Sequence, residues 1–156
     1  MNSSVQRIGI ILSASAVVAV VANSMHPRRI PWVRDWSHQV EAKAAEQKIP
    51  VIPLSVAREK LSSGSAVFVD ARSASEFAKG HIPGAISIPF EHLGDDYATI
   101  DDLIGSGREL VVYCKNRDCD DALLFVSELQ KMGCNKAVLY IDGFDAWKRF
   151  GGKVEP

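Results

Sequence analysis

A short apolar run that stops at a cysteine is the feature that most constrains this chain. Residues 111–113 (Val-Val-Tyr) are typical of a buried β-strand, and Cys114 follows them directly. A polar loop comes next, and apolar residues then recur at helical spacing: Ala122, Leu123, Phe125, Val126, Leu129 and Met132. In an open α/β sheet, ligands bind in the crevice at the carboxyl ends of the strands. Cys114 is therefore predicted to lie in such a crevice, beside the start of a helix.

This position favours a reactive thiol. A helix N-terminus presents unpaired N–H groups and a positive dipole end, which lower the pKa of a nearby thiol and favour the reactive thiolate. The sequence thus predicts a nucleophilic Cys114 on an anion-binding nest of backbone N–H groups. The residues of this loop are Lys115, Asn116, Arg117, Asp118 and Cys119. The alternative is a buried, inert thiol, since free cysteine is among the most buried residue types.

Strands and helices alternate along the rest of the chain. Apolar runs predict strands at residues 66–70, 85–88, 110–113 and 137–141. Helices are predicted between them from a capping box at Ser73 and Glu76 and from a stop at Gly133. Residues 49–53, which contain two prolines, are interpreted as a helix break and a domain boundary near Pro50. The alternation predicts an α/β fold with a mostly parallel central sheet and helices on both faces.

Composition excludes several functions. The net charge is −1 with no basic surplus, so no nucleic-acid partner is expected. The three cysteines lack paired C-x-x-C spacing and no histidine lies beside Cys114, so we expect no metal, no cofactor and no disulfide scaffold. A cysteine phosphatase is disfavoured because Asp120 stands where such an enzyme needs an arginine for the phosphate.

The N-terminus differs from the rest of the chain. Residues 8–22 carry no charge and are almost long enough to cross a bilayer. We interpret residues 1–26 as a transmembrane anchor, with a signal segment cleaved near Ala22, or a buried core helix, as the alternatives. Residues 27–50 are predicted to form a juxtamembrane linker and helix, followed by one domain at 51–156.

Basic and aromatic residues follow the apolar run, as expected near lipid headgroups. They are Arg28, Arg29, Trp32, Arg34 and Trp36. Three arginines after the span, against Arg7 and the α-amino group before it, favour the cytoplasmic side for the domain by one charge. After cleavage, the domain would instead be exported.

Three stretches together resemble the rhodanese family. They are residues 69–85, which include Val-Asp-Ala-Arg and His-Ile-Pro-Gly-Ala, residues 111–120, and residues 141–147 (Ile-Asp-Gly-Phe-Asp-Ala-Trp). The likeness spans roughly residues 53–152. It implies a single rhodanese domain with a parallel sheet flanked by helices. It also implies a sulfurtransferase that carries sulfur as a persulfide on Cys114, from thiosulfate or a thiol persulfide to a thiol or cyanide.

Other residues of the family pattern are expected to be structural. Asp70, Arg72 and Glu76 lie at and after a predicted strand end, where such groups brace loops. His81 is expected to form a local hydrogen bond in its His-Ile-Pro-Gly turn. Trp147 is expected to pack in the core.

The loop departs from the family at its end. Many rhodaneses carry a basic residue where this chain has Cys119, and carboxylates at Asp118, Asp120 and Asp121 outnumber the two cations of the loop. We therefore expect better activity with a thiol-borne persulfide than with thiosulfate. Cys119 either resolves a persulfide or sulfenic acid on Cys114 by forming a disulfide, or simply fills space. Cys134 is expected to be a structural or surface thiol.

A second class of function stays open. A rhodanese-like module without catalysis would bind a partner or sense redox state through the Cys114/Cys119 pair. The expected partners are a small sulfur donor, a thiol acceptor, membrane lipid around the N-terminal helix, and a membrane-bound redox or sulfur-metabolism protein.

Overall fold

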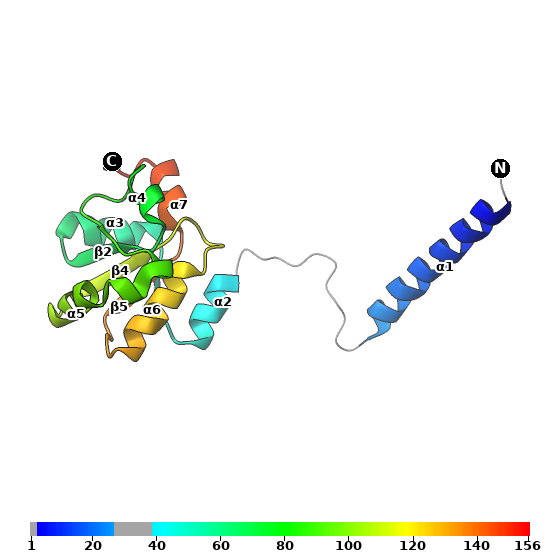
Figure 1. Ribbon diagram of the computed structural model, residues 1–156, viewed down its shortest axis with the longest axis horizontal. Helices are drawn as coiled ribbons and strands as arrows, with labels where there is room; N and C mark the ends of the chain where they lie inside the picture. The colour runs from blue at the N-terminus through cyan, green and yellow to red at the C-terminus, as the bar shows by residue number, and fades with distance from the viewer. Residues whose placement is uncertain (1–2, 27–38) are drawn as a thin grey trace. The chain divides into compact units, whose positions relative to one another are not determined.

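The computed structural model describes residues 3–26 and 39–156 in two compact units, 1–35 and 36–156. The first unit contains one helix, α1 (Ser3–Met25), shown in blue in Figure 1. Within it, residues 5–25 are apolar enough and long enough to cross a membrane, with a mean hydropathy of 2.0. The predicted apolar helix is confirmed. A signal sequence would pass the same test, so anchoring stays a prediction, and the arginines and tryptophans of residues 28–36 lie outside the described residues.

The second unit is built on a parallel sheet of five strands. Its strands are β1 (Val51–Ile52), β2 (Ala66–Asp70), β3 (Ile86–Ser87), β4 (Glu109–Tyr113) and β5 (Ala137–Tyr140). They lie in the order β1-β5-β4-β2-β3, and every neighbouring pair is parallel. The predicted parallel sheet is confirmed. Because β4 is central, the loop that follows it emerges from the middle of the sheet.

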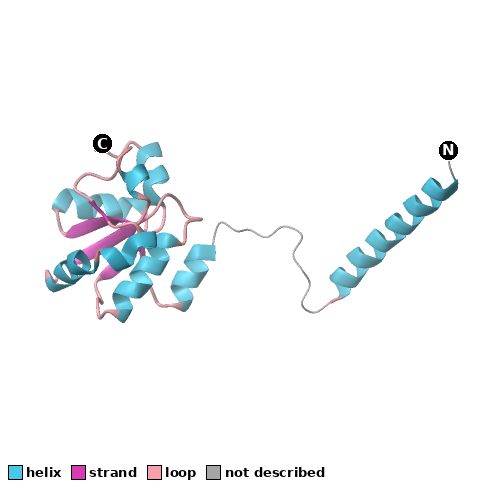
Figure 2. Cartoon of the chain, in the orientation of Figure 1, coloured by secondary structure: helices cyan, strands magenta, loops and turns pink. Residues whose placement is uncertain are grey.

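Helices cover both faces of the sheet, as Figure 2 shows. They are α2 (Gln39–Glu46), α3 (Leu54–Ser63), α4 (Ala74–Phe77), the 3-10 segment η1 (Phe90–Asp95), α5 (Tyr97–Gly105), α6 (Asp121–Lys131) and α7 (Gly143–Arg149). The predicted capping box starts α4, because the Ser73 hydroxyl accepts a hydrogen bond from the Glu76 N–H. Gly133 has a positive φ of 91° just after α6, as a helix stop requires.

Alternate residues of each strand divide the core into two layers. On β4, Val112 packs with α2, α5 and α6, whereas Val111 packs with α3 and α7. Phe68 and Val69 on β2 divide in the same way, because successive side chains of a strand point to opposite faces. Figure 1 shows the same two sets of helices on opposite sides of the strands. The sheet is thus held from both sides, and its carboxyl edge can present loops at fixed positions.

One helix before the predicted boundary near Pro50 packs on this core, and a strand just after the boundary joins the sheet. Val40 and Ala44 of α2 are buried in the same cluster as α6, so α2 packs on the domain as well as preceding it. Strand β1 was missed by the sequence analysis, which interpreted its flanking prolines only as breaks. An edge strand tolerates proline at its ends, and here the Pro50 carbonyl accepts a hydrogen bond from the Leu139 N–H.

Candidate active site

Cys114 lies at the carboxyl end of β4, as the sequence predicts, but it is not a free thiol. Its sulfur is bonded to Cys119 in a disulfide, with 6.2 Å between the two Cα atoms. Cys114 is only 4% exposed and packs in the apolar layer beneath α6, whereas Cys119 is half-buried. That Cys114 acts as a nucleophile stays a prediction, and it applies to the reduced form of the pair. In this oxidised form, an incoming sulfur compound reaches Cys119 more readily than Cys114.

The loop between the two cysteines is tied down by α7 and by its own polar groups. The Phe144 N–H donates to the Cys114 carbonyl, and the Asp145 N–H donates to that of Lys115, both at 2.9 Å. Within the loop, the N–H groups of Asp118 and Cys119 donate to Asn116. Two of the five amides expected to form the anion nest are therefore already engaged. At most three of the five can bind an anion in this form of the loop.

The cations of the loop do not face the sulfurs as a pair. Arg117 forms ion pairs with Asp142 at 2.7 Å and with Glu41 of α2 at 2.8 Å. The hydrogen bond to Asp142 raises the pKa of Arg117 further, so its charge is permanent but compensated. Lys115 is exposed. Arg117 consequently contributes little positive potential at Cys114.

Carboxylates dominate the other side of the disulfide. One oxygen of Asp121, at the first position of α6, lies 3.4 Å from the Cys119 sulfur and 3.8 Å from the Cys114 sulfur. The same side chain lines a pocket of about 250 Å³ together with Ala71, Ser73, Glu76, Phe90 and Glu91. Partial burial raises the pKa of Asp121, and the charges of Asp120, Glu91 and Glu76 raise it further. The pocket beside the cysteines is thus acidic.

The remaining residues of the family pattern form a buried brace. Arg72 forms an ion pair with Asp70 at 2.5 Å, donates to the Gly80 carbonyl and lies over the ring of Phe144. His81 stacks on Phe77, and its Nδ1 lies 3.1 Å from the carbonyl oxygen of that residue. Trp147 is buried and donates to the Lys153 carbonyl. All these described contacts hold loops against the sheet.

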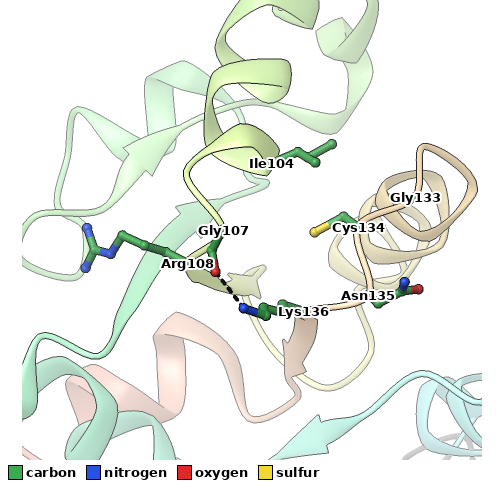
Figure 3. Close-up of a pocket in the computed structure, with 7 residues that line it drawn as sticks. All are labelled: Ile104, Gly107, Arg108, Gly133, Cys134, Asn135 and Lys136. Atoms are coloured by element: carbon green, nitrogen blue, oxygen red, sulfur yellow. Dashed lines mark hydrogen bonds between the residues drawn. The ribbon is translucent and has the colours of Figure 1, made fainter.

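Cys134 is the free cysteine of the structure and lies at the amino ends of the strands, at the opposite end of the sheet from Cys114. It lines a pocket of about 220 Å³ together with Arg108 and Lys136, which immediately precede β4 and β5. Figure 3 shows these lining residues. These residues mark the amino ends of the strands, whereas Cys114 follows a carboxyl end. Cys134 therefore does not contribute to the chemistry of the Cys114 loop.

Among the described residues, one group offers three closely spaced ligand atoms for a metal. The donor atoms of Cys114, Cys119 and Asp121 lie within 4.8 Å of one another. The disulfide leaves neither sulfur as a thiolate, which is the form that binds metal. The group as it stands is a redox pair with a carboxylate beside it.

Comparison with known proteins agrees with this architecture. The model of the rhodanese-like domain family matches residues 54–150, which include β2 to β5 and the Cys114 loop. The chain belongs to the rhodanese-like family. The resemblance seen in the sequence is thereby confirmed, and the rhodanese-like domain occupies most of the chain.

Several solved structures share the fold. A protein from Bacillus halodurans is 22% identical with a TM-score of 0.62, over 76% of this chain and 85% of its own. A thiosulfate sulfurtransferase from Pseudomonas aeruginosa is 24% identical with a TM-score of 0.59, over 77% of this chain but 22% of its own. A human single-domain sulfurtransferase is 27% identical with a TM-score of 0.52, over 64% of this chain and 96% of its own.

One curated relative is a transcriptional regulator. This chain is 42% identical over 57 residues to an HTH-type transcriptional regulator of Mycobacterium tuberculosis. The match covers 36% of this chain and about a quarter, 24%, of that regulator. The shared part is thus a fragment of both proteins.

Sequence reasoning counted Asp121 as one of several surrounding charges and missed Glu91. Nothing in the order of residues brings Glu91 near the cysteines, because it lies in η1, more than 20 residues upstream. The packing of η1 against α6 brings Glu91 to the pocket that Asp121 lines. The helical spacing of apolar residues predicts that α6 begins near Asp121. It does not predict that the Asp121 carboxylate contacts both sulfurs.

Proposed function

We propose that this rhodanese-like protein is a membrane-tethered sulfurtransferase that uses Cys114 as its nucleophile and Cys119 as a resolving thiol. The observation that carries the proposal is the pairing of these two cysteines within one loop at the carboxyl end of the central strand. Membership of the family and the likeness to a human single-domain sulfurtransferase support sulfur transfer.

The reaction starts from the reduced pair. The Cys114 thiolate attacks the outer sulfur of a donor, a thiol persulfide in preference to thiosulfate, and the remainder of the donor leaves. Cys114 then carries a persulfide. A thiol or cyanide acceptor removes the outer sulfur and regenerates the Cys114 thiolate.

The Cys119 thiol provides a second way to remove the outer sulfur of the Cys114 persulfide. It attacks the inner sulfur on Cys114, which forms the disulfide and releases the outer sulfur as hydrogen sulfide. Two thiols are oxidised and one sulfane sulfur is reduced, so the electrons balance. A dithiol reductant returns the pair to its starting state.

Mass spectrometry of the full-length protein in detergent tests the nucleophile. The protein is reduced, freed of reductant, and mixed with cysteine persulfide. In Cys119→Ser, which cannot resolve, Cys114 should gain one sulfur atom, whereas wild type should release sulfide and form the disulfide. Cys134→Ser is the control and should behave as wild type. Absence of any sulfur on Cys114 in Cys119→Ser would overturn the proposal.

A redox-sensing module is the second candidate, and the closed disulfide favours it. A sensor would form the Cys114–Cys119 disulfide with a general oxidant but would neither gain sulfur nor release sulfide. The same experiment therefore separates the two functions.

We propose further that α1 anchors the domain to a membrane. Its length and apolarity support this, and the apolar side chains of residues 5–25 are exposed in the structure. A tethered enzyme would act on a membrane-bound redox or sulfur-metabolism partner, and the residues before and after the span favour the cytoplasmic side.

A further inference from the structure

Asp121 is the one described carboxylate that contacts both sulfurs of the loop. Its Oδ2 atom lies 3.4 Å from the Cys119 sulfur and 3.8 Å from that of Cys114. Neither sulfur of a disulfide carries a proton, so each must gain one when the bond opens and lose one when it closes. The Asp121 oxygen lies within reach of both positions at which those protons are exchanged.

We propose that Asp121 is a catalytic proton carrier for the Cys114–Cys119 pair. This inference rests on the proposed function only in assuming that the pair cycles between disulfide and dithiol. When the disulfide opens, the carboxylic acid protonates the departing Cys114 sulfur. When it closes, the carboxylate removes the proton of Cys119.

The opening step balances without any further reactant beyond a dithiol. One thiolate of the dithiol attacks the Cys119 sulfur, which is the more exposed of the two, and the Cys114–Cys119 bond breaks. The electron pair stays on Cys114, and the Asp121 proton moves to it. The Asp121 carboxylate then takes the proton of the second thiol of the dithiol. The resulting thiolate attacks the dithiol sulfur that is bonded to Cys119 in the mixed disulfide. Cys119 leaves, receives that proton from Asp121, and the dithiol departs as a cyclic disulfide.

The closing step uses the same group in reverse. Cys119, deprotonated by Asp121, attacks the inner sulfur of the Cys114 persulfide. The outer sulfur departs as hydrosulfide and takes up the proton from Asp121 as hydrogen sulfide. Opening therefore starts with the acid and ends with the carboxylate, whereas closing starts and ends with the carboxylate, so Asp121 takes up one proton from solvent in each cycle.

The surroundings of Asp121 favour its protonated form more than bulk water does. Glu91 of η1 and Glu76 of α4 line the same pocket, and Asp120 precedes Asp121 in the chain. Lys43 of α2 pairs with Asp120 at 2.6 Å, Arg72 interacts electrostatically with Glu76, and the His92 ring lies 3.7 Å from Glu91. None of these described contacts is with Asp121 itself. Partial burial and these carboxylates raise the pKa of Asp121 above its ordinary value of 3.8. The pocket also gives the proton a path to solvent.

The test is the rate at which dithiothreitol opens the disulfide of the full-length protein in detergent, measured at several pH values. Each rate is divided by the thiolate concentration of the reagent, so that only the protein contributes to the remaining pH dependence. In wild type this thiolate-specific rate constant should fall as pH rises through the pKa of Asp121, because the acid form is lost. In Asp121→Asn it should be independent of pH and about 10²-fold below the low-pH value of wild type.

Two variants act as matched controls. Asp121→Glu should restore a pH-dependent fall. Asp120→Asn makes the same change of charge one residue away, and it should keep the fall but shift it to lower pH, because a neighbouring negative charge is removed. The asparagine variant should still fold, since a carboxylate with a raised pKa opposes folding when it is ionised.

Three results would overturn the proposal. The first is a wild-type rate constant that does not change with pH. The second is an Asp121→Asn rate constant at or above the low-pH value of wild type, which would mean that the carboxylate only repels the attacking thiolate. The third is an Asp120→Asn pH profile equal to that of Asp121→Asn. The assay uses no sulfur donor. The disulfide-opening assay can therefore be interpreted even if Cys114 fails to gain sulfur. A rate constant that does not change with pH, together with normal sulfur gain on Cys114, would reject only the role of Asp121.

Discussion

Cys119 stands where many rhodaneses carry a basic residue, and the replacement changes what the loop can do. A cation at this position would attract an anionic donor, whereas a thiol 6.2 Å away, measured between Cα atoms, closes a disulfide with Cys114. The loop of this chain therefore forms a reversible disulfide at a position where other family members attract an anionic donor. Its resting form is then set by the available reductant.

Cys119 should also protect Cys114 from oxidants. With an excess of hydrogen peroxide, the reduced wild type should form the disulfide through a sulfenic acid on Cys114 and recover fully with dithiothreitol. Cys119→Ser should progress to irreversible sulfinic acid and lose most of its sulfur-accepting capacity. Alkylation and mass spectrometry measure both products. Equal recovery of the two proteins would rule out a resolving role for Cys119.

The acidic pocket should determine the choice of donor. Glu91→Lys should raise kcat/KM for thiosulfate, a dianion, by about tenfold at low salt, and the gain should shrink as ionic strength rises. The rate with the persulfide of N-acetylcysteamine, which carries one negative charge less, should change much less. Glu59→Lys, in the half of α3 that runs toward the amino ends of the strands, is the charge-matched control. Similar gains in both variants would exclude a local effect of the pocket.

The ion pair of Arg72 and Asp70 should be a main contributor to stability. Both side chains are almost fully buried, so Arg72→Met leaves the Asp70 charge without its partner and should cost about 3–5 kcal/mol. Lys131→Met removes the exposed pair with Glu128 and should cost less than about 1 kcal/mol. Urea unfolding followed by circular dichroism measures both. A cost for Arg72→Met as small as that of the control would contradict the buried brace.

At the scale of elements, the start of α7 positions the cysteine loop. Gly143 has a positive φ of 69°, and a Cβ atom added there would lie 2.7 Å from backbone atoms of Lys115 and Asn116. The backbones of α7 and the loop therefore approach more closely than any side chain allows. The two hydrogen bonds from Phe144 and Asp145 to the loop depend on this approach.

Gly143→Ala should displace the loop as well as strain the helix start. We expect a loss of stability of about 1–3 kcal/mol and a slower opening of the disulfide or its failure to reform. Gly151→Ala is the matched control, because Gly151 also has a positive φ, of 77°, but open space around it. Urea unfolding and alkylation of the free thiols measure the two effects. Equal costs for both variants would mean that only the backbone angle matters.

Across the whole molecule, the apolar helix and the rhodanese-like domain are separate compact units. Removal of residues 1–26 deletes α1 and leaves the domain core intact, since every residue of the two core clusters lies at or beyond Val40. The truncated protein should move from the membrane pellet to the supernatant and keep its sulfur-accepting capacity. Fractionation after a carbonate wash, with immunoblotting, measures this. A full-length protein already in the supernatant and shortened at its N-terminus would indicate signal cleavage instead.

The sequence by itself determined the α/β class, the parallel sheet and the place of Cys114, because these depend on local periodicity and on residues that start or stop helices. The helix start at Ser73 and Glu76 and the helix stop at Gly133 depend on contacts within one turn of the chain. They could therefore be predicted. Strand β1 was not, because two residues between prolines have no period and pair only through β5. The contact of Asp121 with both sulfurs, the pairing of Arg117 with Glu41 and Asp142, and the acidic pocket with Glu91 were decided by tertiary structure alone. The ion pairs of Arg117 and the pocket with Glu91 join segments that only the crossovers of the parallel sheet bring together. Asp121 is close to both cysteines in sequence, but its contact with both sulfurs depends on how the loop folds back onto the start of α6. In each case the partner is determined by distance in space, which the order of residues does not encode.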